Sequence, residues 1–174
     1  MVKNLMLNDK DLQHWITKRN VAAKLVYPGV PTPTVPDAAR ALGVKSEQIL
    51  KSLVFLCDGQ PCLVVAAGEV RISYKKLADH FGMSRRKVKM ASAEGALEIS
   101  GFEVGAMPPF GHEEALTTFV DADSIRGDYA VYYGGGGTKD ALLELTLTTL
   151  LEVTRASVIS LTETVIVKNT EEMS

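Results

Sequence analysis

The sequence has few cysteines, no long apolar run and no strong excess of charge of either sign. Its two cysteines, Cys57 and Cys62, flank a turn, and without an export signal we expect reduced thiols there. No apolar run reaches the ~18 residues needed to cross a membrane. The opening MVKNLMLNDKD lacks the apolar core and cleavage site of a secretory signal. We therefore expect a cytoplasmic protein with no membrane partner.

Motifs for metals and for common hydrolases are also missing. Cys57 and Cys62 form a lone C-x4-C pair, and none of the three histidines has metal-ligand spacing to another. The chain contains no G-x-S-x-G, no H-E-x-x-H and no paired-carboxylate motif. We expect neither metal nor cofactor. An enzyme built this way would depend on positioned water and backbone donors.

Length and composition are those of one ordinary globular domain. The chain has 174 residues, of which 46% are hydrophobic and 23% charged, and its net charge is -2. A chain of this size can bury a core without staples. Because it is not a polycation overall, contact with nucleic acid would need a local basic patch. We predict a single domain over 1–174, with a flexible polar tail at 163–174.

Capping residues and apolar spacing predict a mixture of helices and strands. Asn8 or Asp9 begins a helix with Leu12, Trp15 and Ile16 on its apolar face. Further helices are predicted at 34–43, 73–82, 92–100 and 146–155, and strands at 50–57, 62–67, 88–91, 117–122, 129–134, 141–146 and 157–161. There is no regular βαβ repeat. This favours an α/β protein of the mixed α+β kind, with a mostly antiparallel mixed sheet wrapped by helices.

The segment GFEVGAMPPFGH, at 101–112, combines free and rigid backbone. Pro108 and Pro109 hold the chain extended, while Gly105 and Gly111 provide hinges. Such a segment can present backbone N–H groups to a ligand at small entropic cost. It also fits a plain surface turn, and periodicity alone favours the turn.

Two other features could serve a ligand. The four glycines of YYGGGGTKD, at 132–140, could present successive N–H groups to an anion or a carbonyl oxygen, or form a flexible hairpin connection. They are no dinucleotide fingerprint, because a strand rather than a helix is predicted next. Lys51 begins an apolar strand in ILKSLVF, so it either reaches solvent at the strand end or serves a ligand.

Basic residues are dense in one part of the chain. The cluster falls within fifteen residues that contain one acid, Asp79, and consists of Lys75, Lys76, Arg85, Arg86, Lys87 and Lys89. Such a surface would attract phosphates. A solvated helix face followed by a basic turn explains it equally well.

Taken in order, three motifs of the chain resemble the YbaK and prolyl-tRNA synthetase-associated editing domain family. They are ILKSLVF, SGFEVGAMPPFG, and YAVYYGGGG followed by LLEL. The resemblance covers about residues 20–160. Family members hydrolyse the ester of mischarged tRNA, on a mixed sheet wrapped by helices. The resemblance implies a hydrolase, an aminoacyl-tRNA deacylase acting in trans, since the chain has no room for a synthetase domain. Its partners would be mischarged aminoacyl-tRNA and an aminoacyl-tRNA synthetase.

The resemblance also implies roles for individual residues. Lys51 would contact the terminal adenosine end of the tRNA, and Gly105 and Pro109 would belong to the G-x-x-x-P loop of the catalytic pocket. The other implied pocket residues are Gly101, Phe102, Ala106, Met107, Pro108, Phe110, Gly111, His112, Gly135 and Gly136, and the basic cluster would bind tRNA. Water would attack the ester, backbone N–H groups would stabilise the oxyanion, and a ribose hydroxyl of the tRNA would assist.

This sequence departs from the family pattern inside the loop. Ala106 stands where relatives often have Gly or Ser, and Pro108 where they usually have Ser or Thr. The missing hydroxyl motivates an alternative, a module that binds tRNA ends or an aminoacyl nucleotide without hydrolysis. A third hypothesis is a nucleotide or phosphate-metabolite protein that uses the glycine run. Met107 and Phe110 are candidates to set the pocket volume.

Overall fold

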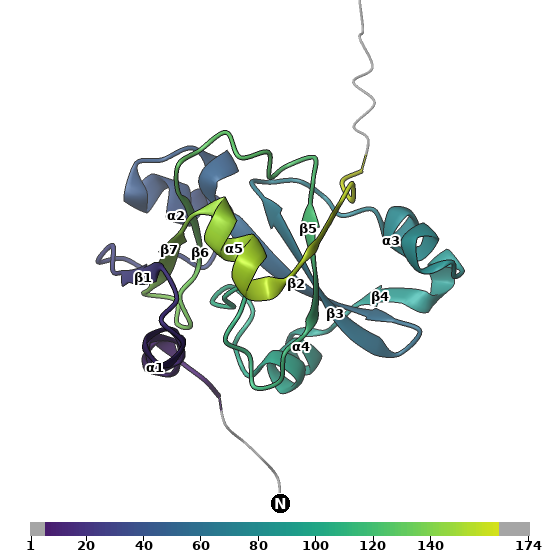
Figure 1. Ribbon diagram of the computed structural model, residues 1–174, viewed down its shortest axis with the longest axis horizontal. Coiled ribbons are helices and arrows are strands. Elements are labelled where there is room, and N and C mark those ends of the chain that lie inside the picture. The colour runs from purple at the N-terminus through teal and green to yellow at the C-terminus, as the bar shows by residue number, and fades with distance from the viewer. Residues whose placement is uncertain (1–5, 164–174) are drawn as a thin grey trace, which may run out of the picture.

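The computed structural model describes residues 6–163, which form two β-sheets and five α-helices (Figure 1). The elements are α1 (Asp9–Arg19), β1 (Ala23–Val26), α2 (Val35–Leu42), the 3-10 turn η1 (Ser46–Gln48), β2 (Leu50–Cys57), β3 (Gln60–Ala67), α3 (Tyr74–Phe81), the 3-10 turn η2 (Arg85–Lys87), β4 (Val88–Met90), α4 (Ala93–Ser100), β5 (Thr117–Asp121), β6 (Tyr132–Gly135), β7 (Leu142–Leu145), α5 (Leu147–Thr154) and β8 (Ser157–Ile159). Of the tail predicted at 163–174, only Glu163 belongs to the described residues.

The strands form one sheet of five and one of three. The larger has the order β4-β2-β3-β5-β8 and the smaller the order β1-β7-β6. Only the β3–β5 and β5–β8 pairs are parallel, so the sheets are mostly antiparallel, as predicted. A bridge between Ile49 and Tyr133 links the two. The strands are divided between two sheets where one was expected, and β1, which pairs with β7, was not predicted.

The β2–β3 hairpin is the centre of the larger sheet. It pairs Leu50 with Ala67 and Cys57 with Gln60, and the predicted turn at Asp58 and Gly59 closes it. One face of β3 belongs to the main core, between the two sheets, and the other face to a second core under α3. Almost every residue of β3 is therefore buried, which explains why its sequence is apolar without alternation.

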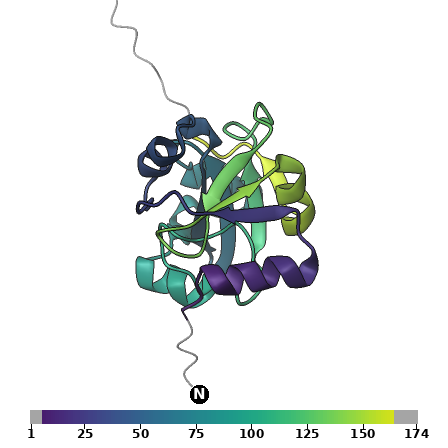
Figure 2. The same ribbon diagram turned by 90° about the vertical axis from the view of Figure 1, so that its left-hand side faces the viewer.

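The helices begin and end at the predicted kinds of residue. The side chains of Asn8, Thr34, Ser73, Ser92 and Thr146 accept hydrogen bonds from the first turns of the five helices. Figure 2 shows α1 and α4 at the lower end of the molecule, below β1. Within residues 6–163, no helix is long and apolar enough to cross a membrane.

Most of the segment 101–112 is buried, although its sequence suggests a surface turn, and only Val104 and Gly105 are exposed. Phe102, Met107 and Phe110 are at most 5% exposed and belong to the main core. Gly105 and Gly111 adopt the left-handed conformation, with φ of 87° and 83°. The glycines therefore turn the backbone so that both proline residues and their neighbours face inward.

The two cysteines are free thiols that face the second core. Their Sγ atoms lie 3.8 Å apart, and both side chains are buried. Burial raises the pKa of both thiols, which keeps them protonated and unreactive. The expectation of reduced thiols in strands is confirmed.

Candidate functional site

Three segments far apart in the sequence meet around one cavity of about 250 Å³, here called the Lys51 cavity. The segments are the start of α2 with the residues before it, the first half of β2 with Ile49, and the loop at 104–107; the end of β6 and Leu142 of β7 complete the lining. The lining residues are Thr32, Pro33, Thr34, Val35, Ala38, Ile49, Leu50, Lys51, Ser52, Leu53, Val104, Gly105, Met107, Gly134, Gly135 and Leu142. Three sequence features thus converge here: the strand lysine, the loop and the glycine run.

Lys51 is the only titratable side chain in this lining. It is half-buried, and its Nζ donates a hydrogen bond to the backbone oxygen of Val70. Burial lowers the pKa of Lys51, and the nearby negative charge of Glu69 partly opposes that shift. An ammonium has three donors, so Lys51 can bind an oxygen of a ligand without giving up Val70.

The glycine run fits closely against the loop. A Cβ at Gly135 would overlap the carbonyl oxygen of Met107, while one at Gly134 would lie 3.5 Å from Pro109, an ordinary contact. The N–H of Gly137 donates to the oxygen of Ala106 at 2.8 Å. Gly135 is therefore required for close approach of two backbones.

This packing corrects the idea that the glycine run binds an anion. Gly134 and Gly135 belong to β6 and pair with β7, and the N–H of Gly136 donates to Ala141 at 3.1 Å. With Gly137 also engaged, no row of free N–H groups remains. The first two glycines end strand β6, and Gly136 and Gly137 lie in the hairpin connection from β6 to β7. The run offers no phosphate site, and the nucleotide-protein hypothesis loses its motivation.

The loop divides its residues between two cavities. Gly105 and Met107 line the Lys51 cavity, whereas Pro109, Phe110, Gly111 and His112 line a second cavity of about 250 Å³. We call it the Trp15 cavity, and its other lining residues are Trp15, Arg19, Glu113, Ala115, Leu116, Thr118, Val153 and Thr154. Of the two side chains expected to set the pocket volume, only Met107 faces the Lys51 cavity.

Five other predicted pocket residues lie beneath the surface. Phe102 and Ala106 are completely buried, and Gly101 packs against Leu7. Pro108 is buried as well and is not part of either lining. Gly136 packs against the backbone of Ala141. These residues shape the pocket walls from behind.

His112 fastens the loop from the side of the Trp15 cavity. Its Nε2 lies 2.8 Å from the carbonyl oxygen of Pro108, and because a carbonyl only accepts, Nε2 carries the proton. The His112 and Phe102 rings pack edge to face, with their centres 6.1 Å apart. Burial lowers the pKa of His112, with the Pro108 hydrogen bond partly opposing the shift.

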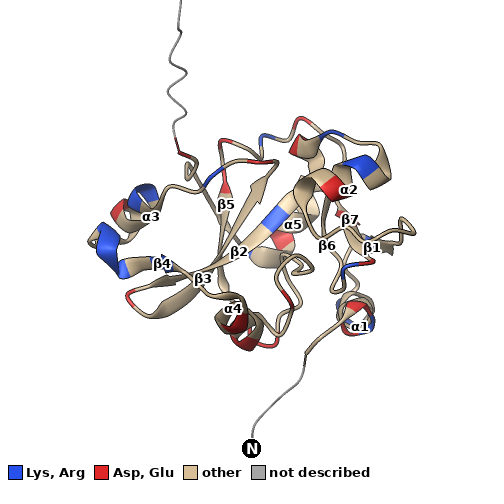
Figure 3. Cartoon of the chain, turned by 180° about the vertical axis from the view of Figure 1, so that it is seen from behind, with Lys and Arg blue, Asp and Glu red and all other residues tan. Residues whose placement is uncertain are grey.

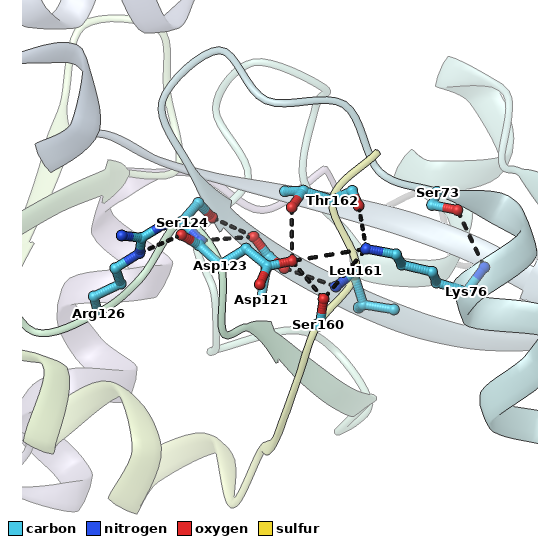
Figure 4. Close-up of polar contacts among 9 residues, drawn as sticks. All are labelled: Ser73, Lys76, Asp121, Asp123, Ser124, Arg126, Ser160, Leu161 and Thr162. Atoms are coloured by element: carbon cyan, nitrogen blue, oxygen red, sulfur yellow. Dashed lines mark hydrogen bonds and ion pairs between the residues drawn. The ribbon is translucent and has the colours of Figure 1, made fainter. Parts of the chain in front are cut away.

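The basic cluster lies at the α3 end of the molecule, with α4 acidic (Figure 3). Three of its members are tied to acids, in the pairs Lys75–Asp79, Lys76–Asp123 and Lys87–Asp58. Lys76 also donates to Ser160 and Thr162, so it anchors the segment after β8 (Figure 4). Arg85, Arg86 and Lys89 form no ion pair within residues 6–163. Three of the six basic side chains are therefore free of ion pairs with these residues and available to phosphates.

Sequence reasoning missed one wall of the Lys51 cavity. Thr32, Val35 and Ala38 come from the connection before α2 and from its first turns, and Ser52 follows Lys51 on β2. The only sequence signal here was the helix start at Thr34, which concerns local structure. Nothing in that signal indicates that the helix end would face the loop at 104–107.

Comparisons with known proteins agree with this arrangement. The model of the aminoacyl-tRNA editing domain family matches residues 30–153, which include every residue that lines the Lys51 cavity. The Bacillus subtilis protein YwhH, described as uncharacterized, is 35% identical over 114 residues, covering 65% of this chain and 69% of YwhH. A proline–tRNA ligase from Nitratidesulfovibrio vulgaris is 28% identical over 122 residues, covering 68% of this chain but only 21% of the ligase.

A solved structure with a related sequence also has the same fold. It is described as "a putative trans-editing enzyme for prolyl tRNA synthetase" and superimposes with a TM-score of 0.80 at 31% identity, covering 90% of this chain and 97% of that one. This agreement extends beyond the part of the chain that the family model matches. The chain belongs to the aminoacyl-tRNA editing domain family.

Proposed function

We propose that this protein is a trans-acting aminoacyl-tRNA deacylase that removes the wrong amino acid from mischarged tRNA. The observation that carries the proposal is the convergence of Lys51, Gly105 and Gly135 on one cavity. The similarity to a trans-editing enzyme over 97% of that chain supports action in trans. The similarity to proline–tRNA ligases favours tRNA for proline as the substrate.

The substrate would lie with its amino acid inside the Lys51 cavity and its terminal adenosine at the mouth. The inner wall is apolar, with Val35, Ala38 and Leu142 among its side chains, and suits a small apolar amino acid. Lys51 would bind a phosphate or ribose oxygen through charge-assisted hydrogen bonds. The ester would then lie near the loop at 105–107.

Hydrolysis needs a nucleophile and a stabilised oxyanion. A water would attack the ester carbonyl carbon, the bond from that carbon to the ribose oxygen would break, and the ribose oxygen would leave with a proton. The N–H groups of Gly105 and Met107 make no hydrogen bond with residues 6–163, so they can serve as oxyanion donors. One such donor contributes about 3 kcal/mol to transition-state stabilisation.

The proposal also accounts for the lack of a general base. Besides Lys51, the lining of the Lys51 cavity has only hydroxyl, apolar and backbone groups. A substrate-assisted reaction, in which a ribose hydroxyl of the tRNA orients or activates the water, needs no carboxylate or imidazole at this place. The loop and Lys51 then contribute by holding the ester and its charge.

A non-catalytic module that binds tRNA ends is the alternative, motivated by Pro108. The structure weakens that motivation, because Pro108 does not line the Lys51 cavity and its carbonyl is held by His112. The two functions differ in their product. Deacylation releases free amino acid over time, whereas a binding module forms a stable complex with the ester intact.

A deacylation screen tests the proposal. Purified protein is incubated with a panel of mischarged tRNAs, including alanyl- and cysteinyl-tRNA for proline, and the remaining ester is followed over time. We expect release of the amino acid from at least one of them. Lys51→Met should lower kcat/KM by roughly 10–100-fold, the equivalent of one lost charge-assisted hydrogen bond.

Two controls make the screen decisive. Lys51→Met keeps the methylene stem and removes a half-buried charge, so its melting temperature should be unchanged or higher. Lys24→Met, at an exposed lysine of β1, should leave deacylation unchanged. Full activity of Lys51→Met on every substrate, or ester that persists in a stable complex with the wild type, would contradict the proposal.

A further inference from the structure

A second hollow begins where the Lys51 cavity ends. It has a volume of about 350 Å³ and lies between β2, the segment 70–74 and the edge strand β4. Its lining, here called the Tyr74 groove, consists of Lys51, Leu53, Val70, Arg71, Ile72, Tyr74, Met90 and Glu163. Lys51 and Leu53 belong to both linings, so the two spaces adjoin along β2.

The lining of the Tyr74 groove combines apolar side chains with two cations. Leu53, Val70 and Met90 form the walls, and Met90 is 45% exposed on the edge strand. The two cations are Lys51 and Arg71, and Arg71 is exposed and forms no ion pair inside residues 6–163. Glu163 is the one acid of the lining. A flat apolar ring beside an anion matches this distribution of groups.

Next to the groove, a basic group is stacked on an aromatic ring. The guanidinium of Arg85 lies 4.5 Å from the centre of the Tyr74 ring, stacked on it. The edge of the Tyr74 ring packs against Phe55 at 5.3 Å, which fixes the ring. A guanidinium held on an aromatic ring keeps its other face available for a nucleobase. Arg86 and Lys89, both exposed, continue the positive surface.

We propose that the Tyr74 groove binds the single-stranded nucleotides that precede the terminal adenosine of the tRNA. The inference rests on the proposed function, which places the terminal adenosine at Lys51. The strand must then leave the Lys51 cavity, and the Tyr74 groove offers an adjoining path of suitable chemistry. Bases would contact Leu53, Met90 and the Arg85–Tyr74 stack, and Arg71 would bind a phosphate.

The test compares substrates of increasing length. Deacylation of the alanyl esters of adenosine, of the trinucleotide CCA and of tRNA for proline is measured for the wild type, Arg71→Glu and Met90→Glu. We expect both variants to lower kcat/KM about tenfold for the trinucleotide and the tRNA, in line with the loss of one base or phosphate contact. The adenosine ester should change less than twofold. Both residues are exposed, so the variants should fold.

Lys18→Glu is the matched control, because it makes the same change of charge on an exposed residue of α1. It should leave all three substrates unchanged. Equal losses for the adenosine ester and the trinucleotide, or no loss for either, would overturn the inference while the deacylase function stands. A wild type inactive on every ester would instead overturn the proposed function.

Binding measured without any reaction separates the two proposals further. Fluorescence anisotropy with a labelled single-stranded RNA that ends in CCA and carries no amino acid reports on binding without hydrolysis. We expect wild type and Lys18→Glu to bind alike and Arg71→Glu to bind about tenfold more weakly. Equal binding by all three proteins would contradict the groove proposal, whatever the esterase activity.

Discussion

The Lys51 cavity and the Trp15 cavity lie on two sides of one loop and have the same volume, about 250 Å³. They differ in what their polar groups do. In the Trp15 cavity, Thr118 donates to Leu116, Thr154 donates to Leu150 and His112 bonds to Pro108. These three groups serve the fold, and the cation of this cavity, Arg19, lies over the Trp15 ring, 4.4 Å from its centre. In the Lys51 cavity, Lys51 retains two further donors and the N–H groups of Gly105 and Met107 are unused within residues 6–163.

Volume therefore does not identify the site in this molecule. A cavity whose polar groups are already paired gains nothing by binding a ligand, since each new hydrogen bond would break an old one. A cavity with unused donors and one cation can bind an ester and its phosphate. The following predictions test this difference between the two cavities, beginning with the largest effect.

The contact between Gly135 and the loop should be the most sensitive feature. Gly135→Ala places a methyl group on the carbonyl oxygen of Met107, and neither backbone can give way easily. We expect a loss of at least 1–3 kcal/mol in the free energy of unfolding and an inactive Lys51 cavity. Denaturant melts with deacylation assays measure both.

Gly134→Ala is the control for this change. Its methyl group would meet only ordinary contacts, 3.5 Å from Pro109 and 3.7 Å from Leu50. The free energy of unfolding should stay within about 1 kcal/mol of the wild type. Equal destabilisation by the two variants would mean that the close approach at Gly135 has no special role.

A matched pair of valines distinguishes the cavities by substrate choice. Val35 in α2 lines the Lys51 cavity and Val153 in α5 lines the Trp15 cavity, and both are partly buried. Val35→Ala should enlarge the pocket and improve the relative kcat/KM for larger aminoacyl esters by about tenfold or more. Val153→Ala should leave the preference unchanged. A change of substrate preference in Val153→Ala but not in Val35→Ala would contradict the prediction, because it would mean that the amino acid binds in the Trp15 cavity.

The smallest effect concerns pH and His112. Its pKa is lowered from 6.5 in the folded protein, so below about pH 6.5 the unfolded chain takes up the proton first. The free energy of unfolding should therefore fall as the pH falls from 7 to 5.

His112→Gln should flatten that dependence, since glutamine can still donate from its Nε2 to Pro108 without titrating. His14→Gln, at an exposed histidine of α1, is the control and should retain the wild-type profile. An unchanged slope in His112→Gln would show that residue 112 does not titrate with folding.

Local elements were predicted well because their signals are local. The hairpin at 50–67, the caps at Asn8, Thr34 and Ser73, and the glycines that end α2 and α3 follow from side chains and backbone of neighbouring residues. The strand β1 escaped prediction because its four residues depend on pairing with β7, far along the chain. The strand β6 extends to Gly135, one residue beyond the strand predicted at 129–134, because the sequence of four glycines indicates a turn there.

The site was predictable only through the order of its motifs. Lys51, Gly105 and Gly135 could be selected by resemblance, and the structure brings them to one cavity. That Phe110 and His112 point to the other side depends on the path of the loop around Met107 and Pro108. The pairing of Lys76 with Asp123 and of Lys87 with Asp58 joins residues from distant segments, so the basic cluster looked freer in sequence than it is.

The parallel pairing of β5 with β3 and of β8 with β5 has a consequence for synthesis of the protein. Each pairing waits for a long crossover, so contacts distant in the chain must form before the larger sheet is complete, and folding of such topologies is slow. While the ribosome is still making the chain, β2 and β3 can form their hairpin, but the Lys51 cavity lacks Gly135 and Leu142. In the nascent protein the Lys51 cavity would therefore stay incomplete until β6 and β7 have been made and have joined the smaller sheet.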